Sequence, residues 1–514
     1  MDASVANGGR TEYFTQGLGM SHETWENKWQ SVDRFIRRRR WFRRTWVVQE
    51  CTLGKEVVMK AGDVTLCWRK LAIPLLWANC KLRVNLSSAF NVVHLEQIRK
   101  LHDDGGPMGH ELVGHEIACS GVKASPQQFY AYLDHVVNHL RHFRATNMRD
   151  KIYAAVGMAR YFKPEYPLIA PDYKKSEEEV FVEYATLMLR ELPALEVLSV
   201  AEDGRRKQSN KLPSWCPDYR IGWHSRLFWP GAQKQQGPAF SASGPSDSRI
   251  SIPSIQDGVL TVNGMMVDTI ECGSAILCEL LRIDKDMIGL DELFDVCAEI
   301  SSPYPLTKQD RLEVLWRTMV IDQSKEETFG LQHYPAQSKV AEYFRCCILR
   351  YLAIQYKRMD GADSAEQRRQ KLLDGIEARA PAFGSCSVRF PTRAEIIGLA
   401  RMWVPTDSPD STDATRKINM DANKFITDGS VMQYGARRCV FRTWQHRLLG
   451  LGPESLKKED QVWLLKGGPV LFVLRPCGDG RFKYVGQAYV HGIMHGEWLE
   501  QLAGKDLFNL IEIA

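Results

Sequence analysis

A stretch rich in arginine and tryptophan, residues 37–50, holds the densest group of chemically active side chains in this sequence. It contains Arg44 and Trp46 and ends in a glutamate, Glu50. A carboxylate held against an indole and away from water has a raised pKa, which suits an acid–base or nucleophilic group. Pairing with a nearby arginine is the commoner use of such a glutamate. The candidate catalytic residues are Glu50, Trp46 and Arg44, and an ion pair at Glu50 is the alternative.

Two helices are predicted to position this group. Apolar residues repeat with helical spacing over residues 24–40. The second predicted helix runs from Trp41 to Leu53, with Gly54 as its stop. Residues four apart share a helix face, so this helix would place Glu50 half buried in one row with Phe42 and Trp46. Two β-rich runs follow, Glu56 to Met59 and Val64 to Trp68, and they predict a hairpin.

The composition is that of an ordinary globular protein of several cores. The chain has 514 residues, of which 44% are hydrophobic and 25% charged, which excludes general disorder. The net charge of +5 is too small to predict nucleic-acid binding. The 13 cysteines include no C-x-x-C pair and indicate reduced thiols.

No apolar run reaches the length of a membrane span, and the first residues lack the features of a secretion signal. We therefore expect a cytoplasmic protein. The run of four arginines at residues 37–40 leaves nuclear import as the alternative.

Three histidines in the following helical region have the spacing of metal ligands. Ser125 and Gln128 predict a capping box at the start of a helix, and His135, His139 and His142 share one face of it. That face points away from the apolar stripe, so we expect these histidines to lie in water and to hold no metal.

Several motifs resemble one family. Residues Trp41, Arg44, Trp46, Gln49 and Glu50 are similar to the pattern W-x-x-R-x-W-x-x-Q-E of the fungal heterokaryon-incompatibility (HET) domain. The segments at 149–157, 171–180 and 212–219 resemble the R-D-K-I-Y-A-L-x-G, P-D-Y-x-x-S-x-x-E-V and L-P-S-W-x-P-D-W/Y motifs that follow it. Ser176 and Glu179 predict a capping box in the second of these. We expect these segments to form a scaffold, with Arg149, Asp150 and Lys151 in an ion network; a site at this charged trio is the alternative. The family's earlier motifs, Y-x-x-L-S-Y-x-W-G and W-x-D-x-x-C-I-D-Q, have no counterpart before Trp41. We therefore expect a truncated HET domain.

The C-terminal part is predicted to be a small β module. Short β-rich runs at 439–443, 448–451, 461–465, 470–474 and 482–490 are separated by glycine and proline turns. The sequence of this module, including residues 485–494, also resembles the end of long HET proteins. His491, His495 and Glu497 are possible ligands in this module, although turn and cap roles are the alternative.

The predicted fold class is α+β: a mainly helical chain of several parts, with a truncated α/β HET remnant and a small all-β module. The expected parts are the HET remnant at 1–75, a helical region at 76–235, a small β segment at 236–275, a helical region with linkers at 276–430 and the β module at 431–514. The expected linkers are the polar runs at 356–369 and 406–423.

The resemblance implies a protein of heterokaryon incompatibility, self/non-self recognition and programmed cell death. We expect an interaction or scaffold protein with a protein partner and no intact catalytic domain. The sequence identifies no small-molecule ligand and no cofactor. HET domains resemble Toll/interleukin-receptor domains, some of which cleave NAD with a glutamate four residues after a tryptophan. The alternatives are therefore NAD hydrolysis through Glu50, or an enzyme recruited to a biosynthetic pathway.

Overall fold

The chain folds into two compact units. The structure, a computed structural model, describes residues 22–77, 90–103, 125–161, 165–192, 195–201, 211–222, 240–244, 254–277, 290–325, 332–358, 365–383, 386, 388–402, 412–428, 431–502 and 507–514. Unit 1 comprises Met1–Leu192, Gln208–Leu212 and Asp218–Trp223. Unit 2 comprises Pro193–Lys207, Pro213–Pro217 and His224–Ala514. The proline-rich motif at 212–219 thus contributes residues to both units.

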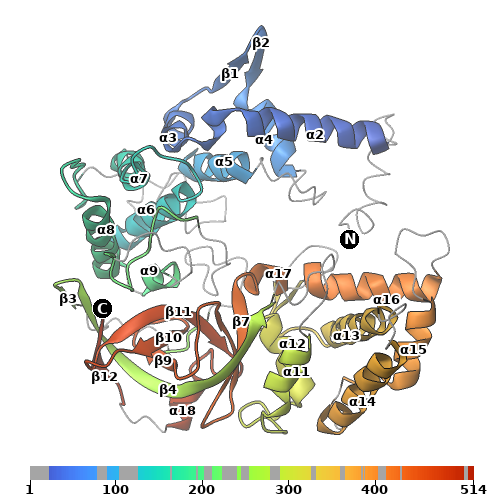
Figure 1. Cartoon of the computed structure of the whole chain (residues 1–514). Helices are drawn as coiled ribbons and strands as arrows, with labels where there is room; N and C mark the ends of the chain where they lie inside the picture. The colour runs from blue at the N-terminus through green and yellow to red at the C-terminus, as the bar shows by residue number, and fades with distance from the viewer. Residues whose placement is uncertain are drawn as a thin grey trace. The chain divides into compact units, whose positions relative to one another are not determined.

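Unit 1 is helical except for one hairpin (Figure 1). Its packing centres on α3, α5, α6, α7 and α8, whose apolar side chains are buried together. The elements in chain order are α2 (His22–Arg38), η1 (Arg40–Arg43), α3 (Thr45–Leu53), β1 (Val58–Ala61), β2 (Val64–Cys67), α4 (Trp68–Trp77), α5 (Phe90–Asp103), α6 (Pro126–Leu140), α7 (Asp150–Arg160) and α8 (Glu177–Glu191).

The predicted helix from Trp41 to Leu53 is wrong in its first part. Residues 40–43 form a separate 3-10 turn, and α3 begins only at Thr45. Arg44 lies between them with extended backbone angles of φ −85° and ψ 134°, which breaks the helical register. The predicted stop is confirmed, because Gly54 is the C-cap of α3, at φ −71°.

Three other local predictions for unit 1 are confirmed. Strands β1 and β2 pair as an antiparallel hairpin, and Gly62 has a positive φ of 63° at the first turn position. Ser125 and Gln128 form a capping box at the start of α6. Ser176 and Glu179 form the same motif at the start of α8.

Unit 2 is built on one eight-stranded sheet with the order β10-β9-β4-β12-β11-β8-β7, in which β3 also pairs with β4. Additional β4–β7 and β10–β11 pairings close the sheet on itself. Its strands are β3 (Ser254–Gln256), β4 (Val259–Ile276), β7 (Arg438–Thr443), β8 (Leu449–Pro453), β9 (Gln461–Leu465), β10 (Leu471–Pro476), β11 (Phe482–Val490) and β12 (Asn509–Ile513).

The small β segment and the C-terminal β module, which we predicted as separate parts, therefore share one sheet. Strand β4 is 18 residues long and pairs with β9 and β12 along its first part and with β7 along its last part. Five of the C-terminal strands lie where the sequence predicts them, within one or two residues. Strand β12 was not predicted.

Helices and a short two-stranded ribbon make up the rest of unit 2. Helices α11 and α12 pack against the sheet, while α13 packs on α15 and α16. The elements are α9 (Glu196–Ser199), α11 (Leu290–Ala298), α12 (Arg311–Met319), β5 (Ser324–Lys325), β6 (Gln332–His333), α13 (Lys339–Arg358), α14 (Ala365–Phe383), α15 (Arg393–Met402), α16 (Asp413–Asn423), η3 (Lys424–Asp428), α17 (Val431–Tyr434) and α18 (Glu497–Gln501).

One predicted linker is wrong, because residues 413–423 form helix α16. Thr412 caps this helix by accepting a hydrogen bond from the Thr415 N–H. Its buried face includes Thr415 and Asn419, so the segment lacks the apolar periodicity by which a helix is recognised.

The α+β class predicted from the sequence is confirmed by a helical unit and a second unit that combines helices with a sheet. Within the described residues, no helix combines the length and the apolar character needed to cross a membrane.

Candidate functional site

Trp46, one of the three candidate residues, holds a buried carboxylate. Its indole N–H donates to Oδ2 of Asp150 at 3.0 Å. The other oxygen of that carboxylate, Oδ1, accepts a hydrogen bond from the Tyr173 hydroxyl at 2.9 Å. Asp150 is buried at the start of α7. Both of its oxygens are thus satisfied by residues of two other motifs, as a buried carboxylate requires.

The contact between α3 and α7 continues at Gln49, one turn after Trp46. A Cβ atom placed on Gly157 would lie 2.9 Å from Nε2 of Gln49. Such a distance is too short for two nonbonded heavy atoms that do not share a hydrogen bond. Glycine at 157 therefore lets the Gln49 side chain lie directly on the backbone of α7.

Helix α7 is also tied to the segment that precedes α8. The Tyr153 hydroxyl donates to the carbonyl oxygen of Asp172 at 2.9 Å and accepts from the Asp172 N–H at 3.1 Å. Arg149 donates to the carbonyl oxygen of Tyr173 at 2.8 Å and to that of Lys175. Side chains of one motif thereby fix the backbone of the next.

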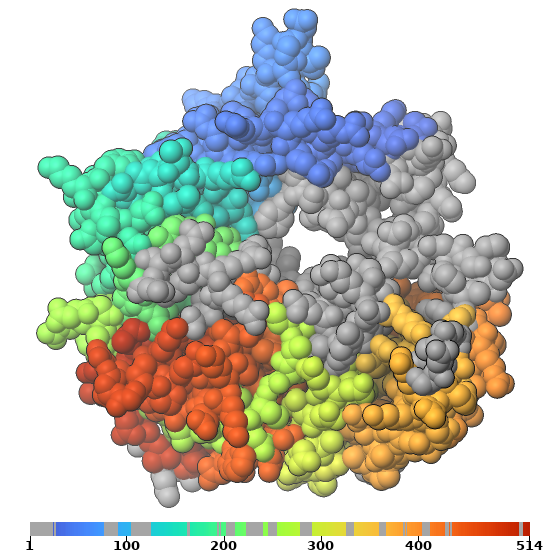
Figure 2. Space-filling model, viewed as in Figure 1, coloured from blue at the N-terminus to red at the C-terminus, as the bar shows by residue number. Residues whose placement is uncertain are grey.

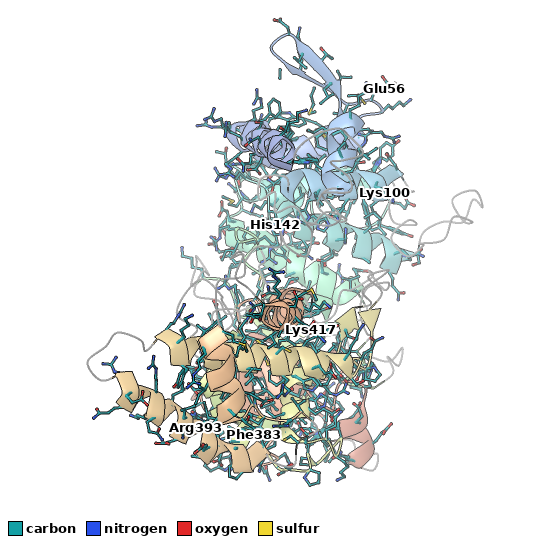
Figure 3. All side chains as sticks on the ribbon, turned by 90° about the vertical axis from the view of Figure 1, so that its right-hand side faces the viewer. Glu56, Lys100, His142, Phe383, Arg393 and Lys417 are labelled. Carbon is teal, nitrogen blue, oxygen red and sulfur yellow. The ribbon has the colours of Figure 1, made fainter. Side chains whose placement is uncertain are left out.

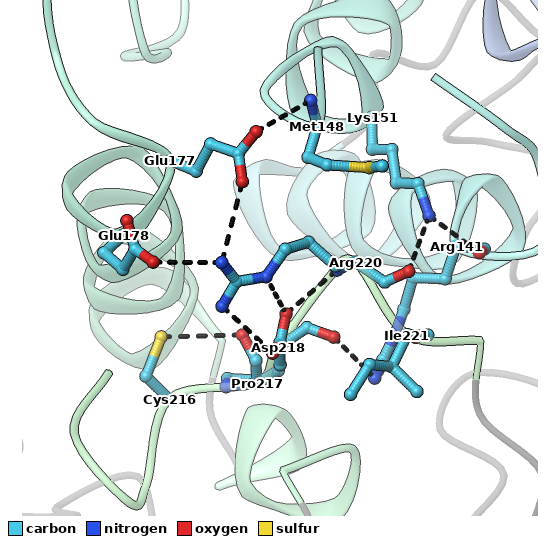
Figure 4. Close-up of polar contacts among 10 residues, drawn as sticks. All are labelled: Arg141, Met148, Lys151, Glu177, Glu178, Cys216, Pro217, Asp218, Arg220 and Ile221. Carbon is cyan, nitrogen blue, oxygen red and sulfur yellow. Dashed lines mark hydrogen bonds and ion pairs between the residues drawn. The ribbon is translucent and has the colours of Figure 1, made fainter. Parts of the chain in front are cut away.

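A buried lysine and an arginine extend these contacts (Figure 4). Lys151 Nζ donates to the carbonyl oxygens of Arg141 at 2.9 Å and Arg220 at 3.2 Å. Burial lowers the pKa of Lys151 to about 8. The Arg220 guanidinium binds Asp218 at 2.8 Å and Glu178 at 2.9 Å. A lysine whose ammonium donates to two carbonyl groups is positioned as a structural cation.

Arg44 and Glu50 do not join this network. Arg44 is exposed, and its backbone forms a short bridge to Arg144. Glu50 is also exposed, which corrects the predicted half-buried position. Within the described residues its carboxylate makes no hydrogen bond or ion pair. The reason is that α3 buries Val47, Val48 and Cys51, and Glu50 lies off that face.

The predicted ion pair at Glu50 is therefore wrong for the described residues, and the structure does not bring the three candidates together. Trp46 points to Asp150, while Arg44 and Glu50 lie at the solvent. A catalytic role for Glu50 stays a prediction. Asp150, which sequence reasoning treated as part of a scaffold, is the carboxylate that contacts the indole.

Comparisons with known proteins agree with the motifs. Residues 407–511 match the model of the Het-6 beta-barrel domain. The chain is 22% identical over 519 residues to heterokaryon incompatibility protein 6, OR allele, of Neurospora crassa, with 94% of this chain and 68% of the relative covered. The chain is therefore similar to fungal proteins of the HET type. No solved structure matches it significantly.

The motifs of unit 1 that resemble this family contact one another directly. Trp46 and Gln49 belong to the first motif, Asp150 and Gly157 to the second, and Tyr173 to the third. The contacts are made by aromatic, carboxylate and amide side chains and by the backbone of one glycine. These motif residues therefore hold the helices of unit 1 against one another.

The predicted solvent position of the α6 histidines is wrong for His139, which is buried. Its ring contacts His94 of α5 at a centroid distance of 4.7 Å, and His142 stacks on His94 at 4.9 Å. His135 lies 4.3 Å from His139. Burial lowers the pKa of His94 to about 4. The sequence analysis did not identify His94 as the partner, because it lies on α5, and the spacing of residues within α6 does not show where α5 packs.

A groove between α4 and α5 is another candidate for binding. It has a volume of about 530 Å³ and is lined by Arg69, Ile73, Leu76, Glu96, Gln97, Lys100 and Asp103. Figure 3 labels Lys100 on α5. None of the three predicted catalytic residues lines this groove. Across the described residues, no group of three or more histidine, cysteine, aspartate or glutamate side chains is arranged to hold a metal ion.

The region that matches the Het-6 beta-barrel domain contributes His491 and Tyr489 to a buried polar relay with Gln309. His491 Nε2 lies 2.6 Å from the acceptor Oε1 of Gln309, so this nitrogen carries the proton. The other ring nitrogen, Nδ1, then accepts from the Tyr489 hydroxyl at 3.0 Å. Burial lowers the pKa of His491 to about 3. Glu497, by contrast, accepts from the His495 N–H at 2.7 Å, which is a local turn contact.

Proposed function

We propose that this chain takes part in fungal heterokaryon incompatibility as an interaction or scaffold protein. In this role it binds a protein partner in the cytoplasm during self/non-self recognition and leads to cell death without chemistry at the Trp46–Glu50 segment. The similarity to heterokaryon incompatibility protein 6 of Neurospora crassa supports the process. The contacts of the first motif support the non-catalytic role.

The observation that carries the non-catalytic role is the pair of hydrogen bonds on Asp150. Trp46 and Tyr173 each donate to one oxygen of this carboxylate. A tryptophan that is engaged in this way positions α3 against α7, and its role in the motif is explained by folding. Glu50 contributes nothing to that contact, since its carboxylate lies at the solvent.

An incompatibility assay tests this proposal. The gene would be expressed from an inducible promoter in a recipient fungus, and the growth and viability of heterokaryons with a panel of partner strains would be measured. We expect the wild-type chain and Glu50→Gln to reduce heterokaryon viability equally. Asp150→Asn should weaken the effect in proportion to the loss of folded protein, measured as soluble protein in extracts. If the wild-type chain leaves heterokaryon viability unchanged with every partner strain of the panel, the proposed process is wrong.

The alternative, NAD hydrolysis through Glu50, predicts a different result. Purified wild-type protein and Glu50→Gln would each be incubated with NAD, and the remaining NAD would be measured by chromatography. Glutamate-dependent loss of NAD, together with loss of incompatibility in Glu50→Gln, would show that the scaffold proposal is wrong. Equal and negligible loss in both proteins is expected from the scaffold role.

A further inference from the structure

The β1–β2 hairpin has an unpaired outer edge. Within the described residues, β1 and β2 form a two-stranded sheet with no third strand. The hairpin projects from the helices of unit 1 (Figure 1), and Figure 2 shows it standing out at the surface. Two side chains near the strand ends, Val58 and Val64, are 59% and 67% exposed. A free strand edge with exposed apolar side chains is a template for pairing with another strand.

The pairing register tells which backbone groups lie on that edge. Ala61 and Val64 pair next to the two-residue turn, and such flanking residues bond to each other. Because bonded and non-bonded pairs alternate along an antiparallel ladder, the N–H and C=O groups of Val58 and Lys60 point away from β2.

The side chains on the same row are exposed. Glu56, Val58 and Lys60 are exposed, whereas Val57, Met59 and Ala61 between them are half buried. Strand β1 begins at Val58, and the ladder continues to Val57, whose carbonyl oxygen accepts from the Trp68 N–H at 2.9 Å. Glu56 lies next to it, in the bend at residues 55–56 that leads into the strand. Figure 3 labels Glu56 at the base of the hairpin. The exposed side chains along this edge are therefore an acid, Glu56, an apolar residue, Val58, and a base, Lys60.

We propose that β1 pairs with β1 of a second copy of this chain, antiparallel and centred on Val58. In that register Val58 faces Val58 of the second copy, and Glu56 faces Lys60 of the second copy twice. Opposite charges that face each other across strands stabilise a pair, whereas like charges destabilise it. The row is thus complementary to itself in one register.

The charges along β1 determine whether this edge pairs with a second copy or prevents such association. A lysine on an edge strand usually prevents association, because a second copy would bring a second lysine close to it. Here a glutamate lies four residues before Lys60 and would be its neighbour in the antiparallel pair. Pairing would also extend a two-stranded sheet, which is marginal by itself, to four strands. The edge is short, so we expect association that depends on protein concentration.

Single charge reversals test the register. Glu56→Lys would place lysines opposite each other, and Lys60→Glu would place glutamates opposite each other. Sedimentation equilibrium of the full chain over a range of concentrations would give the dissociation constant. We expect wild-type protein to form dimers and each single variant to raise this constant at least about tenfold, since two pairs change from attraction to repulsion.

Two combinations keep the test independent of folding defects. An equimolar mixture of the two single variants restores both Glu–Lys pairs, so the mixture should dimerise as tightly as the wild type although each variant alone dimerises more weakly. The double variant Glu56→Lys/Lys60→Glu should also form dimers. Glu366→Lys and Lys371→Glu make the same charge changes on α14 and should leave the dissociation constant unchanged.

A wild-type chain that stays monomeric at every concentration, or single variants that dimerise as well as the wild type, would overturn the β1 pairing. Failure of the mixture and of the double variant to recover would also overturn it. This inference does not depend on the proposed function. The incompatibility and NAD assays can fail while the dimer is found, and the reverse is equally distinguishable.

Discussion

Asp150 is the residue that explains the first motif best. It is buried, and its two oxygens accept hydrogen bonds from Trp46 and Tyr173. Removing a charged hydrogen-bond acceptor from such a site leaves a buried donor without its partner. This lowers the free energy of unfolding more than the loss of a hydrogen bond at the surface does. The importance of the tryptophan in the motif is thus explained by a contact more than one hundred residues further along the chain.

We predict that Asp150→Asn lowers the free energy of unfolding of unit 1 by about 1–3 kcal/mol, because one amide oxygen cannot replace two carboxylate oxygens. Glu50→Gln is the matched control, since an exposed carboxylate without a partner in the described residues changes stability by less than about 0.5 kcal/mol. Urea unfolding followed by tryptophan fluorescence would measure both. Equal stability of the two variants would contradict the role given to Asp150.

Sequence reasoning found Trp46 but misplaced Glu50, and the cause is local. Trp46 and Glu50 both lie in α3, four positions apart, and the extended backbone of Arg44 separates only Phe42 from their row. Glu50 is exposed because α3 buries the face of Val47, Val48 and Cys51, and the row through Trp46 lies at the edge of that face. The true partner, Asp150, could be found only from the packing of α3 on α7, which no spacing along the chain encodes.

At the scale of elements, local signals predicted most of the strands and helices. Glycine and proline turns between short apolar runs placed β7 to β11 correctly. Capping boxes placed the starts of α6 and α8. The sequence could not show that β4 belongs to the same sheet as β7, because strand pairing over such a separation depends on the whole fold.

Glycines in the sheet supply a test of its close packing. A Cβ atom on Gly450 in β8 would lie 2.6 Å from the carbonyl oxygen of Tyr489 and against the ring of Phe441. We predict that Gly450→Ala destabilises unit 2 by about 2–3 kcal/mol through overpacking. Gly478→Ala is the control, because no heavy atom lies within 4 Å of its added Cβ. Thermal unfolding would compare them, and equal midpoints would contradict the predicted close contact in β8.

At the scale of the whole molecule, each unit contains a histidine whose pKa is lowered strongly by burial. The pKa of His94 in unit 1 falls from 6.5 to about 4, and that of His491 in unit 2 from 6.5 to about 3. The unfolded chain therefore takes up protons below pH 6.5 that the folded chain does not bind. Stability from these groups is complete above that pH and is lost as the pH falls towards the folded values.

We predict that both units lose up to about 1.4 kcal/mol of stability per pH unit and per histidine between roughly pH 6 and 5. Urea unfolding at several pH values would measure the slope. His94→Gln should flatten the slope for unit 1 by about one proton while the slope for unit 2 stays the same. An unchanged unit 1 slope would show that His94 is not kept neutral by folding.

The arrangement of β4 has a consequence for how the protein is made. This strand pairs with β7 and β9, yet the chain between β4 and β7 includes the helices from α11 to α17. During synthesis β4 and the three-residue strand β3 leave the ribosome long before β7, β9 and β12, and closing so large a loop is slow. A long strand that is paired only with β3 attracts other strands, so we expect the nascent chain to be prone to association during that interval.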